Sequence, residues 1–308
     1  MVQPAAFMDR YVIISPVKDE ERYVETTIRS VIAQTIRPAR WLLVDDGSSD
    51  RTPEIIESYC RKHQWMSLLR LPMGAERGAG SPVVQAFLAG YEHVQGEEFD
   101  FIVKLDCDLR LPPTYFGQLL SRFETDARLG IASGIYLEQH DGAQRAIEMP
   151  EYHAAGACKV MRAECYRDID GFVVSRGWDT VDEIRAQCRG WRTTHFADLP
   201  FEHLRPEGSV RGTLYTNRLH GEVFFLTGGP IEFFAFKVLQ RAITGRPPLL
   251  AGLMLLTGYL KPWLLRKRRL VSRDEANHYR RQLRKRIVES LVRKVRLFGL
   301  RVREQRRA

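Results

Sequence analysis

The sequence predicts an α/β protein in which helices flank a mainly parallel central sheet, with a helical appendage at the C-terminal end. Three observations lead to this fold class. Strand-like and helix-like segments alternate through the N-terminal half, acidic clusters follow directly on apolar strands, and the C-terminal region is far more basic than the rest. Strands that alternate with helices are typical of parallel sheets. We expect a first domain over residues 1–215 and a second over residues 216–308.

Apolar runs rich in β-branched and aromatic residues predict the strands, and apolar side chains that recur every three or four residues predict the helices. In chain order we expect strand 11–17, helix 21–35, strand 40–46, helix 52–63, helix 82–93 and strand 101–105. Turn residues, chiefly Gly, Pro and Asp, separate these segments. The order predicts successive strand–helix units.

Acidic residues follow two of these strands. Asp45 and Asp46 end the run RWLLVDD, and Asp106 and Asp108 follow the run FIVKL. In open α/β sheets, ligands bind beyond the carboxyl ends of the strands, and hard divalent cations prefer carboxylate oxygens. The Asp-x-Asp pair alone could be an Asp-rich turn before Pro112. Acids at two strand ends together favour a metal and nucleotide site.

The order of these motifs resembles the family 2 glycosyltransferases, which have the GT-A fold. A proline-ended strand is followed by a helix, by VDDGSSDRT and, about sixty residues later, by DCD. The resemblance covers roughly residues 11–210 and implies a nucleotide-sugar donor with Mn²⁺ or Mg²⁺ as cofactor. One departure is Asp19, which stands where many members have Asn.

The resemblance implies roles for the acidic residues at the strand ends. Asp45 and Asp46 would contact the nucleotide base and ribose, and Asp106 would lie near the ribose and donor sugar. Asp108 would ligate the metal that bridges the diphosphate. Pro16, at the end of the first strand, would also belong to the donor site.

Basic residues would complete the donor site. Arg77, in the glycine-containing segment MGAERGAGSP, is a candidate for a donor-binding loop, although a solvated surface loop explains it equally well. His203 and Arg205 lie in LPFEHLRPEGS. By resemblance, His203 would complete the metal coordination and Arg205 would bind the diphosphate, whereas a lone His is more often structural.

Glycosyl transfer requires a base for the acceptor hydroxyl. Family members carry an acidic motif, often Glu-Asp, one helix before a Gly-aromatic turn, and this spacing identifies Asp179 as the base, with Trp178 in place of the Glu. Asp182 and Glu183 are the alternatives. On spacing alone, Asp179 could instead be a helix N-cap.

The acceptor side is expected to include residues that precede this helix. The segment GACKVMR contributes Gly156 and Lys159, and Trp178 would join them, as the family resemblance implies. A basic helix face would explain the same lysine. These residues are therefore candidates for contact with the acceptor.

Positive charge is concentrated at the C-terminal end. Residues 266–308 contain 17 Lys and Arg against 4 Asp and Glu, a net charge of +13, so the other residues carry −4 of the total of +9. Residues 249–260 are apolar but too short to span a bilayer. From Asp274 onward, apolar residues recur at helical spacing among arginines, which predicts an amphipathic helix on an anionic membrane surface. A nucleic-acid-binding tail and a solvated helix are the alternatives.

The remaining features suggest a reducing compartment. The five cysteines contain no C-x-x-C pair, which argues against a disulfide framework or a zinc cluster, and the segment MVQPAAFMDR does not resemble a secretory signal. We therefore expect a cytoplasmic, peripheral protein on the cytoplasmic face of the membrane.

The sequence predicts a metal-dependent inverting glycosyltransferase of the hexosyltransferase type. It would move sugar to a saccharide or lipid-linked acceptor in polysaccharide or glycolipid synthesis, and no nucleic-acid partner is expected. A nucleotidyltransferase of similar fold is one rival, but the segment SPVKDEERY lacks the Gly-rich basic loop that such an enzyme needs. A non-catalytic membrane-associated binding protein is the other.

Overall fold

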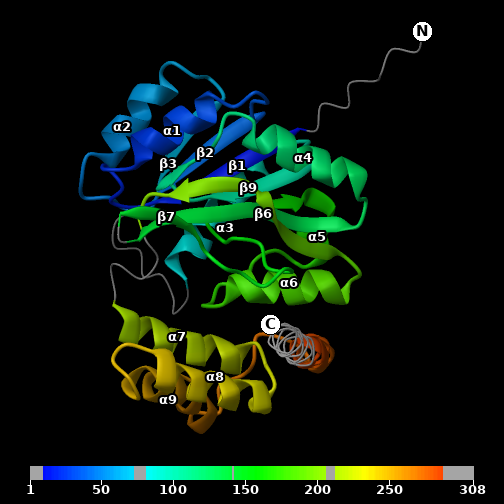
Figure 1. The fold of residues 1–308 in the computed structure, drawn as a ribbon. Coiled ribbons are helices and arrows are strands. Elements are labelled where there is room, and N and C mark those ends of the chain that lie inside the picture. Colours follow the sequence, from blue (N-terminus) through cyan, green and yellow to red (C-terminus); the bar gives the residue numbers. More distant parts are fainter. Residues whose placement is uncertain (1–9, 73–80, 141, 206–211, 287–308) are drawn as a thin grey trace, which may run out of the picture. The chain divides into compact units, whose positions relative to one another are not determined.

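The computed structural model describes residues 10–72, 81–140, 142–205 and 212–286, and the chain divides into two compact units, residues 1–209 and 210–308 (Figure 1). The first unit contains the predicted strands and helices. The second is helical over its described residues. The roles predicted for residues 1–215 and 216–308 stay predictions.

Strands and helices alternate along the first unit, as the sequence predicts. In chain order the elements are β1 (Tyr11–Val17), α1 (Val24–Ile32), β2 (Arg40–Asp45), α2 (Thr52–Cys60), β3 (Met66–Arg70), α3 (Pro82–Val94), β4 (Phe101–Leu105), β5 (Leu109–Arg110), α4 (Tyr115–Thr125), β6 (Leu129–His140), β7 (Ala143–Ala146), β8 (Cys158–Arg162), α5 (Ala163–Asp168), α6 (Trp178–Cys188) and β9 (Arg192–His203). The second half of the unit contains more strand than the sequence pattern revealed.

The strands form one mixed sheet in the order β3-β2-β1-β4-β8-β6-β9-β5, with β7 paired to β6. The strands β3, β2, β1 and β4 are parallel neighbours, in agreement with the predicted strand–helix units. Beyond β4 the pairings are mostly antiparallel, since β8 runs against both β4 and β6. The carboxyl ends of β1, β2 and β4 therefore meet at one edge of the sheet.

Helices cover both faces of this sheet (Figure 1). Alternate residues of β1 enter different cores: Tyr11 and Ile13 pack in the core with α1 and α4, and Val12 and Ile14 pack in the core with α3, α5 and α6. Strands buried on both faces read as continuous apolar runs, which explains the sequence of β1. A charged side chain within such a strand must consequently find a partner inside the protein.

The second unit contains α7 (Thr213–Leu226), α8 (Ile231–Thr244) and α9 (Leu250–Leu264). Glycines allow α7 and α9 to approach closely: a Cβ added at Gly221 would lie 2.0 Å from the Leu255 carbonyl oxygen, and one at Gly258 would lie 2.0 Å from the Arg218 carbonyl oxygen. Within the described residues, no helix is both long and apolar enough to cross a membrane.

The predicted amphipathic basic helix is described as far as residue 286 and is helical from residue 273. Ser272 and Glu275 form a reciprocal capping box at its start, with backbone-to-side-chain distances of 2.7 and 3.2 Å. Its apolar residues Ala276, Tyr279 and Leu283 are buried. This part of the apolar face is therefore used for packing and does not face solvent. The rest of the predicted helix lies outside the described residues.

Candidate functional site

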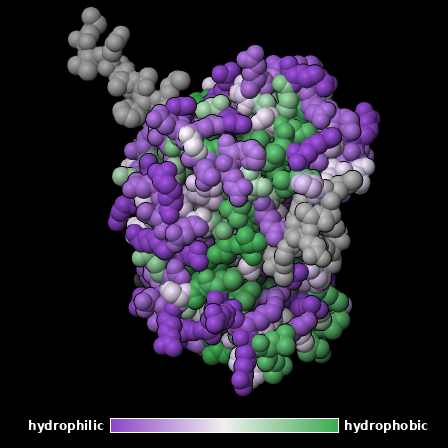
Figure 2. All heavy atoms as spheres, turned by 180° about the vertical axis from the view of Figure 1, so that it is seen from behind, coloured by the Kyte–Doolittle hydropathy of each residue, from purple (hydrophilic) through white to green (hydrophobic). Residues whose placement is uncertain are grey.

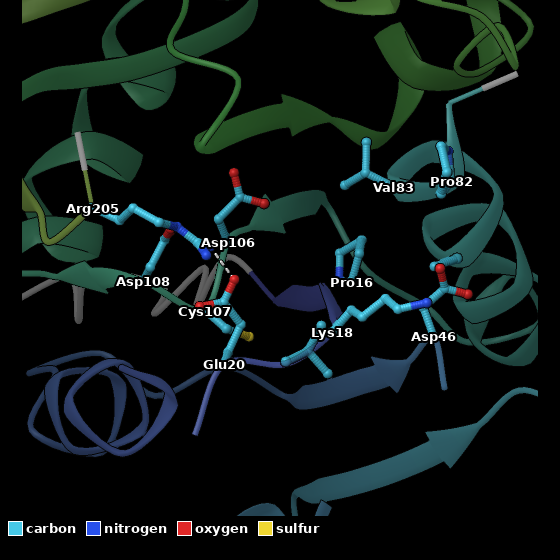
Figure 3. Close-up of a pocket in the computed structure, with 12 residues that line it drawn as sticks. Pro16, Lys18, Glu20, Asp46, Pro82, Val83, Asp106, Cys107, Asp108 and Arg205 are labelled. Atoms are coloured by element: carbon cyan, nitrogen blue, oxygen red, sulfur yellow. Dashed lines mark hydrogen bonds and ion pairs between the residues drawn. The ribbon is translucent and has the colours of Figure 1, made fainter. Parts of the chain in front are cut away.

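A pocket of about 290 Å³ lies at the edge where β1, β2 and β4 end (Figure 3). Five residues predicted for the donor and metal sites line it: Pro16, Asp46, Asp106, Asp108 and Arg205. The other lining residues come from the end of β1 and the segment after it, from the segment after β4 and from the start of α3. Arg77, the predicted loop residue, lies outside the described residues.

Asp45 belongs to the turn beside this pocket. Its Oδ1 accepts hydrogen bonds from the backbone N–H of Ser48 at 3.0 Å and from the Ser48 hydroxyl at 2.5 Å. Asp45 is only 4% exposed and does not line the pocket. In this structure Asp45 closes the turn after β2, and Asp46 is the member of the pair that reaches the pocket.

Asp108 is the centre of a cluster of charged side chains. Arg205 donates to Asp108 Oδ2 through Nε at 3.1 Å and Nη2 at 2.9 Å, and the same Nη2 also donates to Glu20 Oε1. His203 Nε2 lies 3.7 Å from Asp108 Oδ2, and its Nδ1 lies 2.8 Å from Glu138 Oε1. The structure thus brings together the two residues predicted to bind metal.

The charges in this cluster shift one another's ionisation. Burial by itself favours the neutral form of Asp108, but His203 and Arg205 outweigh it and hold the pKa of Asp108 below its usual range. Burial also opposes protonation of His203, yet Asp108 and Glu138 raise its pKa to about 9. Burial and the charge of Asp108 raise the pKa of Glu20 to about 7.

Two oxygens of this cluster suit a divalent cation. Asp108 Oδ1 and Glu20 Oε2 are buried acceptors without a hydrogen-bond partner among the described residues. Among all the described residues, no three His, Cys, Asp or Glu side chains form a metal centre by themselves. Mg²⁺ sites that also use substrate phosphates need only one or two carboxylates from the protein. The residues present therefore fit a metal shared with a diphosphate.

Lys104 joins Asp106 to the predicted acceptor side. Its side chain is 5% exposed, and Nζ donates to Asp106 Oδ1 at 2.5 Å and to the Gly156 carbonyl oxygen at 2.8 Å. Lys104 and Asp106 are two residues apart, so both point to the same face of the sheet. The ammonium also lies 5.5 Å from the centroid of the Trp178 ring.

Lys159, Asp182 and Glu183 form a buried network instead of a substrate-facing site. Their side chains are 0%, 0% and 1% exposed, and Lys159 Nζ lies 2.8 Å from Asp182 Oδ2 and 3.5 Å from Glu183 Oε1. Burial raises the pKa of Asp182 to about 7, although Lys159 opposes this shift. Side chains without exposed surface cannot touch an acceptor here. The structure therefore contradicts the predicted acceptor contact of Lys159 and disfavours Asp182 and Glu183 as the base.

Asp179 lies in the first turn of α6 and is partly exposed. The helix N-cap is Gly177, with a positive φ of 81°, so the alternative of Asp179 as the N-cap is wrong. A Cβ added at Gly156 would lie 3.7 Å from Asp179 Oδ2 and 3.7 Å from Trp178. Gly156 and Trp178, predicted for the acceptor side, therefore lie beside Asp179, the predicted base.

Sequence reasoning missed Lys104 and Glu20. The signal for Lys104 was a charged residue inside an otherwise apolar strand, two positions before Asp106. Glu20 lies in the segment SPVKDEERY, where no local pattern marks it as buried. It is buried beside Arg205, a residue far away in the chain that donates to Glu20 Oε1.

The geometry agrees with a comparison against known families. The model of the family described as glycosyl transferase family 2 matches residues 12–169, slightly more than half of the chain. The chain belongs to this family. It is therefore a glycosyltransferase, which confirms the enzyme class that the sequence predicts.

Curated relatives of this glycosyltransferase match part of it. The undecaprenyl-phosphate 4-deoxy-4-formamido-L-arabinose transferase of Pseudomonas aeruginosa (strain LESB58) is 27% identical over 141 residues, which are 45% of this chain and 39% of that protein. The enzyme of the same description from Pectobacterium carotovorum is 31% identical over 114 residues, which are 35% of this chain and 32% of that protein. The chain thus matches well under half the length of these relatives.

Solved structures confirm the fold of the glycosyltransferase. A mannosyltransferase from Pyrobaculum calidifontis in complex with GDP-Man and Mn²⁺ is similar with a TM-score of 0.54 and 16% identity, covering 94% of this chain and 82% of that one. S. aureus TarS in complex with UDP-GlcNAc has a TM-score of 0.53 and 16% identity, covering 88% and 78%. At such identities the likeness shows the fold alone, and it confirms the predicted GT-A-like fold.

The link through Lys104 predicts a measurable effect on donor binding. Lys104→Met keeps an unbranched side chain but removes the ammonium that orients Asp106. We expect the affinity for UDP or GDP in the presence of Mn²⁺ to fall by about tenfold or more, the loss typical of one hydrogen bond to a charged group. Isothermal titration calorimetry measures this affinity.

Lys159→Met is the matched control because Lys159 is the cross-strand partner of Lys104 in the pairing of β4 with β8. It should lower the unfolding temperature, since it leaves buried carboxylates without their cation, but the folded protein should bind nucleotide as the wild type does. Unchanged affinity in Lys104→Met, or an equal loss in both variants, would contradict the role of Lys104.

Proposed function

We propose that this glycosyltransferase is metal-dependent and inverting, and that it moves a sugar from a nucleotide-sugar donor to a saccharide or lipid-linked acceptor at the cytoplasmic face of a membrane. The observation that carries the proposal is the environment of Asp108. One of its oxygens is buried without a partner among the described residues, and the other is surrounded by Arg205 and His203. Such a group suits a cation and a diphosphate together.

The donor would bind at the strand ends. Asp46 and Pro16 line the part of the pocket next to the turn after β2, where the nucleoside would lie, and Arg205 lines the part next to Asp108, where the diphosphate would lie. Complexes of structural neighbours with GDP-Man and with UDP-GlcNAc support a donor of this class. Carboxylates alone would repel a diphosphate, so positive charge is needed between them.

Asp108 and Glu20 would hold a Mn²⁺ or Mg²⁺ ion. His203 would complete the coordination of this ion, and Glu138, which lies beside His203 Nδ1, would orient the imidazole ring. The ion would neutralise the negative charge that develops on the departing diphosphate. Arg205 would donate hydrogen bonds to the oxygens of the diphosphate. The Mn²⁺ in the mannosyltransferase complex supports this cofactor.

Asp179 would act as the base. Its carboxylate is partly exposed and lies beside Gly156, and no hydrogen bond engages it within the described residues. Removal of the proton from the acceptor hydroxyl lets the oxygen attack the anomeric carbon as the diphosphate leaves from the opposite face. A single displacement of this kind inverts the configuration at the anomeric carbon.

Two further observations support the proposed acceptor and the proposed location. Two curated relatives are described as transferases that act with undecaprenyl phosphate, which supports a lipid-linked acceptor. The net charge of +13 over residues 266–308 supports attraction to anionic lipid. Together they favour work at a membrane surface.

The proposed metal role of Asp108 predicts the behaviour of Asp108→Asn. This variant keeps the shape of the side chain but loses its negative charge, so Mn²⁺ should no longer increase the affinity for UDP or GDP. Calorimetric titration of each nucleotide with and without Mn²⁺ tests this. The control is Asp198→Asn, which removes one charge from a surface pair with Arg122 and should change nothing. Equal enhancement by Mn²⁺ in Asp108→Asn and wild type would sink the idea.

The proposed base predicts a loss of rate without a loss of binding. Asp179→Asn should lower the release of nucleoside diphosphate from the sugar donor by about 10²-fold or more, with donor affinity nearly unchanged. Asp182→Asn should act mainly on stability, because Asp182 pairs with buried Lys159. A full rate in Asp179→Asn, or a fall in its unfolding temperature as the sole effect, would remove Asp179 from the mechanism.

A further inference from the structure

The C-terminal unit presents apolar side chains to solvent on α8 and α9. Seven of them are between 53% and 70% exposed, and the six other than Ile231 are here named the α8–α9 surface: Phe236, Leu239, Ile243, Leu253, Trp263 and Leu264. Figure 2 shows apolar side chains exposed at the lower end of the view, where the C-terminal helices lie. Contiguous exposed apolar side chains mark interaction sites more often than scattered single ones do.

The exposed residues follow the helical repeat. Phe236, Leu239 and Ile243 are spaced by three and four residues, so they form one stripe on α8, while Phe234 on another side of the helix is buried. On α9, Leu253 and Leu264 are eleven residues apart, which is about three turns. Each helix therefore presents an ordered apolar stripe.

Both helices are well packed on their other sides. A Cβ added at Gly252 of α9 would lie 2.8 Å from Ala242 Cβ and 2.8 Å from the Val238 carbonyl oxygen of α8. The rings of Phe234 and Tyr259 are stacked with centroids 4.4 Å apart. The side chains of the α8–α9 surface are therefore exposed although the two helices pack closely against each other.

Basic residues adjoin this surface. Trp263 and Leu264 are followed by Leu265 and by four consecutive basic residues, 266–269, all of them exposed. Lys267 pairs with Glu222 at 3.1 Å, but no acidic side chain among the described residues pairs with Arg266 or Arg268. Tryptophan, leucine and basic residues in this order are typical of segments at the boundary between lipid headgroups and acyl chains.

The helices are too short to cross a bilayer. The fifteen residues of α9 correspond to roughly 22 Å, against about 30 Å for the hydrocarbon core. The buried Ala276, Tyr279 and Leu283 also show that the described part of the following basic helix has no free apolar face. Among the described residues, apolar contact with lipid is therefore available from α8 and α9, lying in the plane of the membrane.

We infer that the α8–α9 surface inserts into the headgroup region of an anionic lipid bilayer, with Arg266 and Arg268 at the lipid phosphates. The inference rests on the proposed function, since an enzyme that glycosylates a lipid-linked acceptor must reach a membrane surface. It assigns the apolar part of that contact to residues 236–264 and the ionic part to the start of the basic region.

Vesicle co-sedimentation of the full chain tests the inference. The vesicles are either phosphatidylcholine alone or equal parts phosphatidylcholine and phosphatidylglycerol. The triple variant combines Leu253→Ser, Trp263→Ser and Leu264→Ser. Its partition coefficient on anionic vesicles should be at least about tenfold lower than that of the wild type, because three apolar side chains no longer enter lipid. Arg266→Gln with Arg268→Gln should abolish much of the preference for phosphatidylglycerol and its sensitivity to salt.

Ile36→Ser with Val174→Ser is the matched control, because these are exposed apolar side chains of the first unit, at 43% and 40%. This variant should bind vesicles as the wild type does. Wild-type binding by the triple variant would overturn the inference. A second result would also overturn the inference: light scattering without lipid shows a dimer for the wild type and a monomer for the triple variant. A second copy of the chain would then cover the surface.

Nucleotide binding separates this inference from the proposed function. All these variants should bind UDP or GDP with Mn²⁺ in solution as the wild type does, because their substitutions lie outside the pocket. If no variant and no wild-type protein binds nucleotide, the proposed function fails while the vesicle result stands. If nucleotide binds and the triple variant still sediments with vesicles, only the inference fails.

Discussion

Two buried lysines set the relation between the proposed donor side and the proposed acceptor side of this protein. The antiparallel pairing of β4 with β8 places Lys104 directly opposite Lys159, and both ammonium groups lie over the ring of Trp178, at 5.5 and 5.2 Å from its centroid. Two like charges in a poorly polar interior repel each other strongly. Each is tolerated because it has its own acid, Asp106 for Lys104 and Asp182 for Lys159. The register of these two strands therefore fixes where the strand-end acids lie relative to α6.

The second constraint is the charge balance around Asp108. A buried carboxylate is stable only with a positive partner, and Arg205 supplies one to both Asp108 and Glu20. Arg205 binds Asp108 Oδ2 and Glu20 Oε1, whereas Asp108 Oδ1 and Glu20 Oε2 have no hydrogen-bond partner among the described residues. A site of this kind can hold a guanidinium and a divalent cation on different oxygens of the same carboxylates when a diphosphate brings its own negative charge. The catalytic proposal thus follows from the same electrostatics that keep the pocket folded.

Local sequence patterns predicted the residues proposed for the donor site. They did not predict the surroundings of residues that depend on pairing between distant strands. Asp106 and Asp108 were placed correctly at a pocket because an apolar run followed by acids marks a strand end wherever that strand lies. Lys159 was assigned to the acceptor side, and Asp182 was given as an alternative base, because the sequence does not reveal that β8 pairs with β4 and that α6 covers this pair. Lys104 was overlooked for the same reason. The parallel half of the sheet was likewise predictable from strand–helix alternation, while the antiparallel half depends on contacts between distant segments.

The central claim is that Asp108, through the oxygen that has no hydrogen-bond partner among the described residues, binds a metal that is shared with the donor diphosphate. A crystal structure of the protein with Mn²⁺ and a nucleoside diphosphate tests it most directly, because the anomalous signal of Mn²⁺ locates the ion. The account predicts Mn²⁺ bonded to a carboxylate oxygen of Asp108 and to diphosphate oxygens, with Arg205 directed at the diphosphate. Nucleotide bound at the strand ends with no Mn²⁺ beside Asp108 would contradict the account.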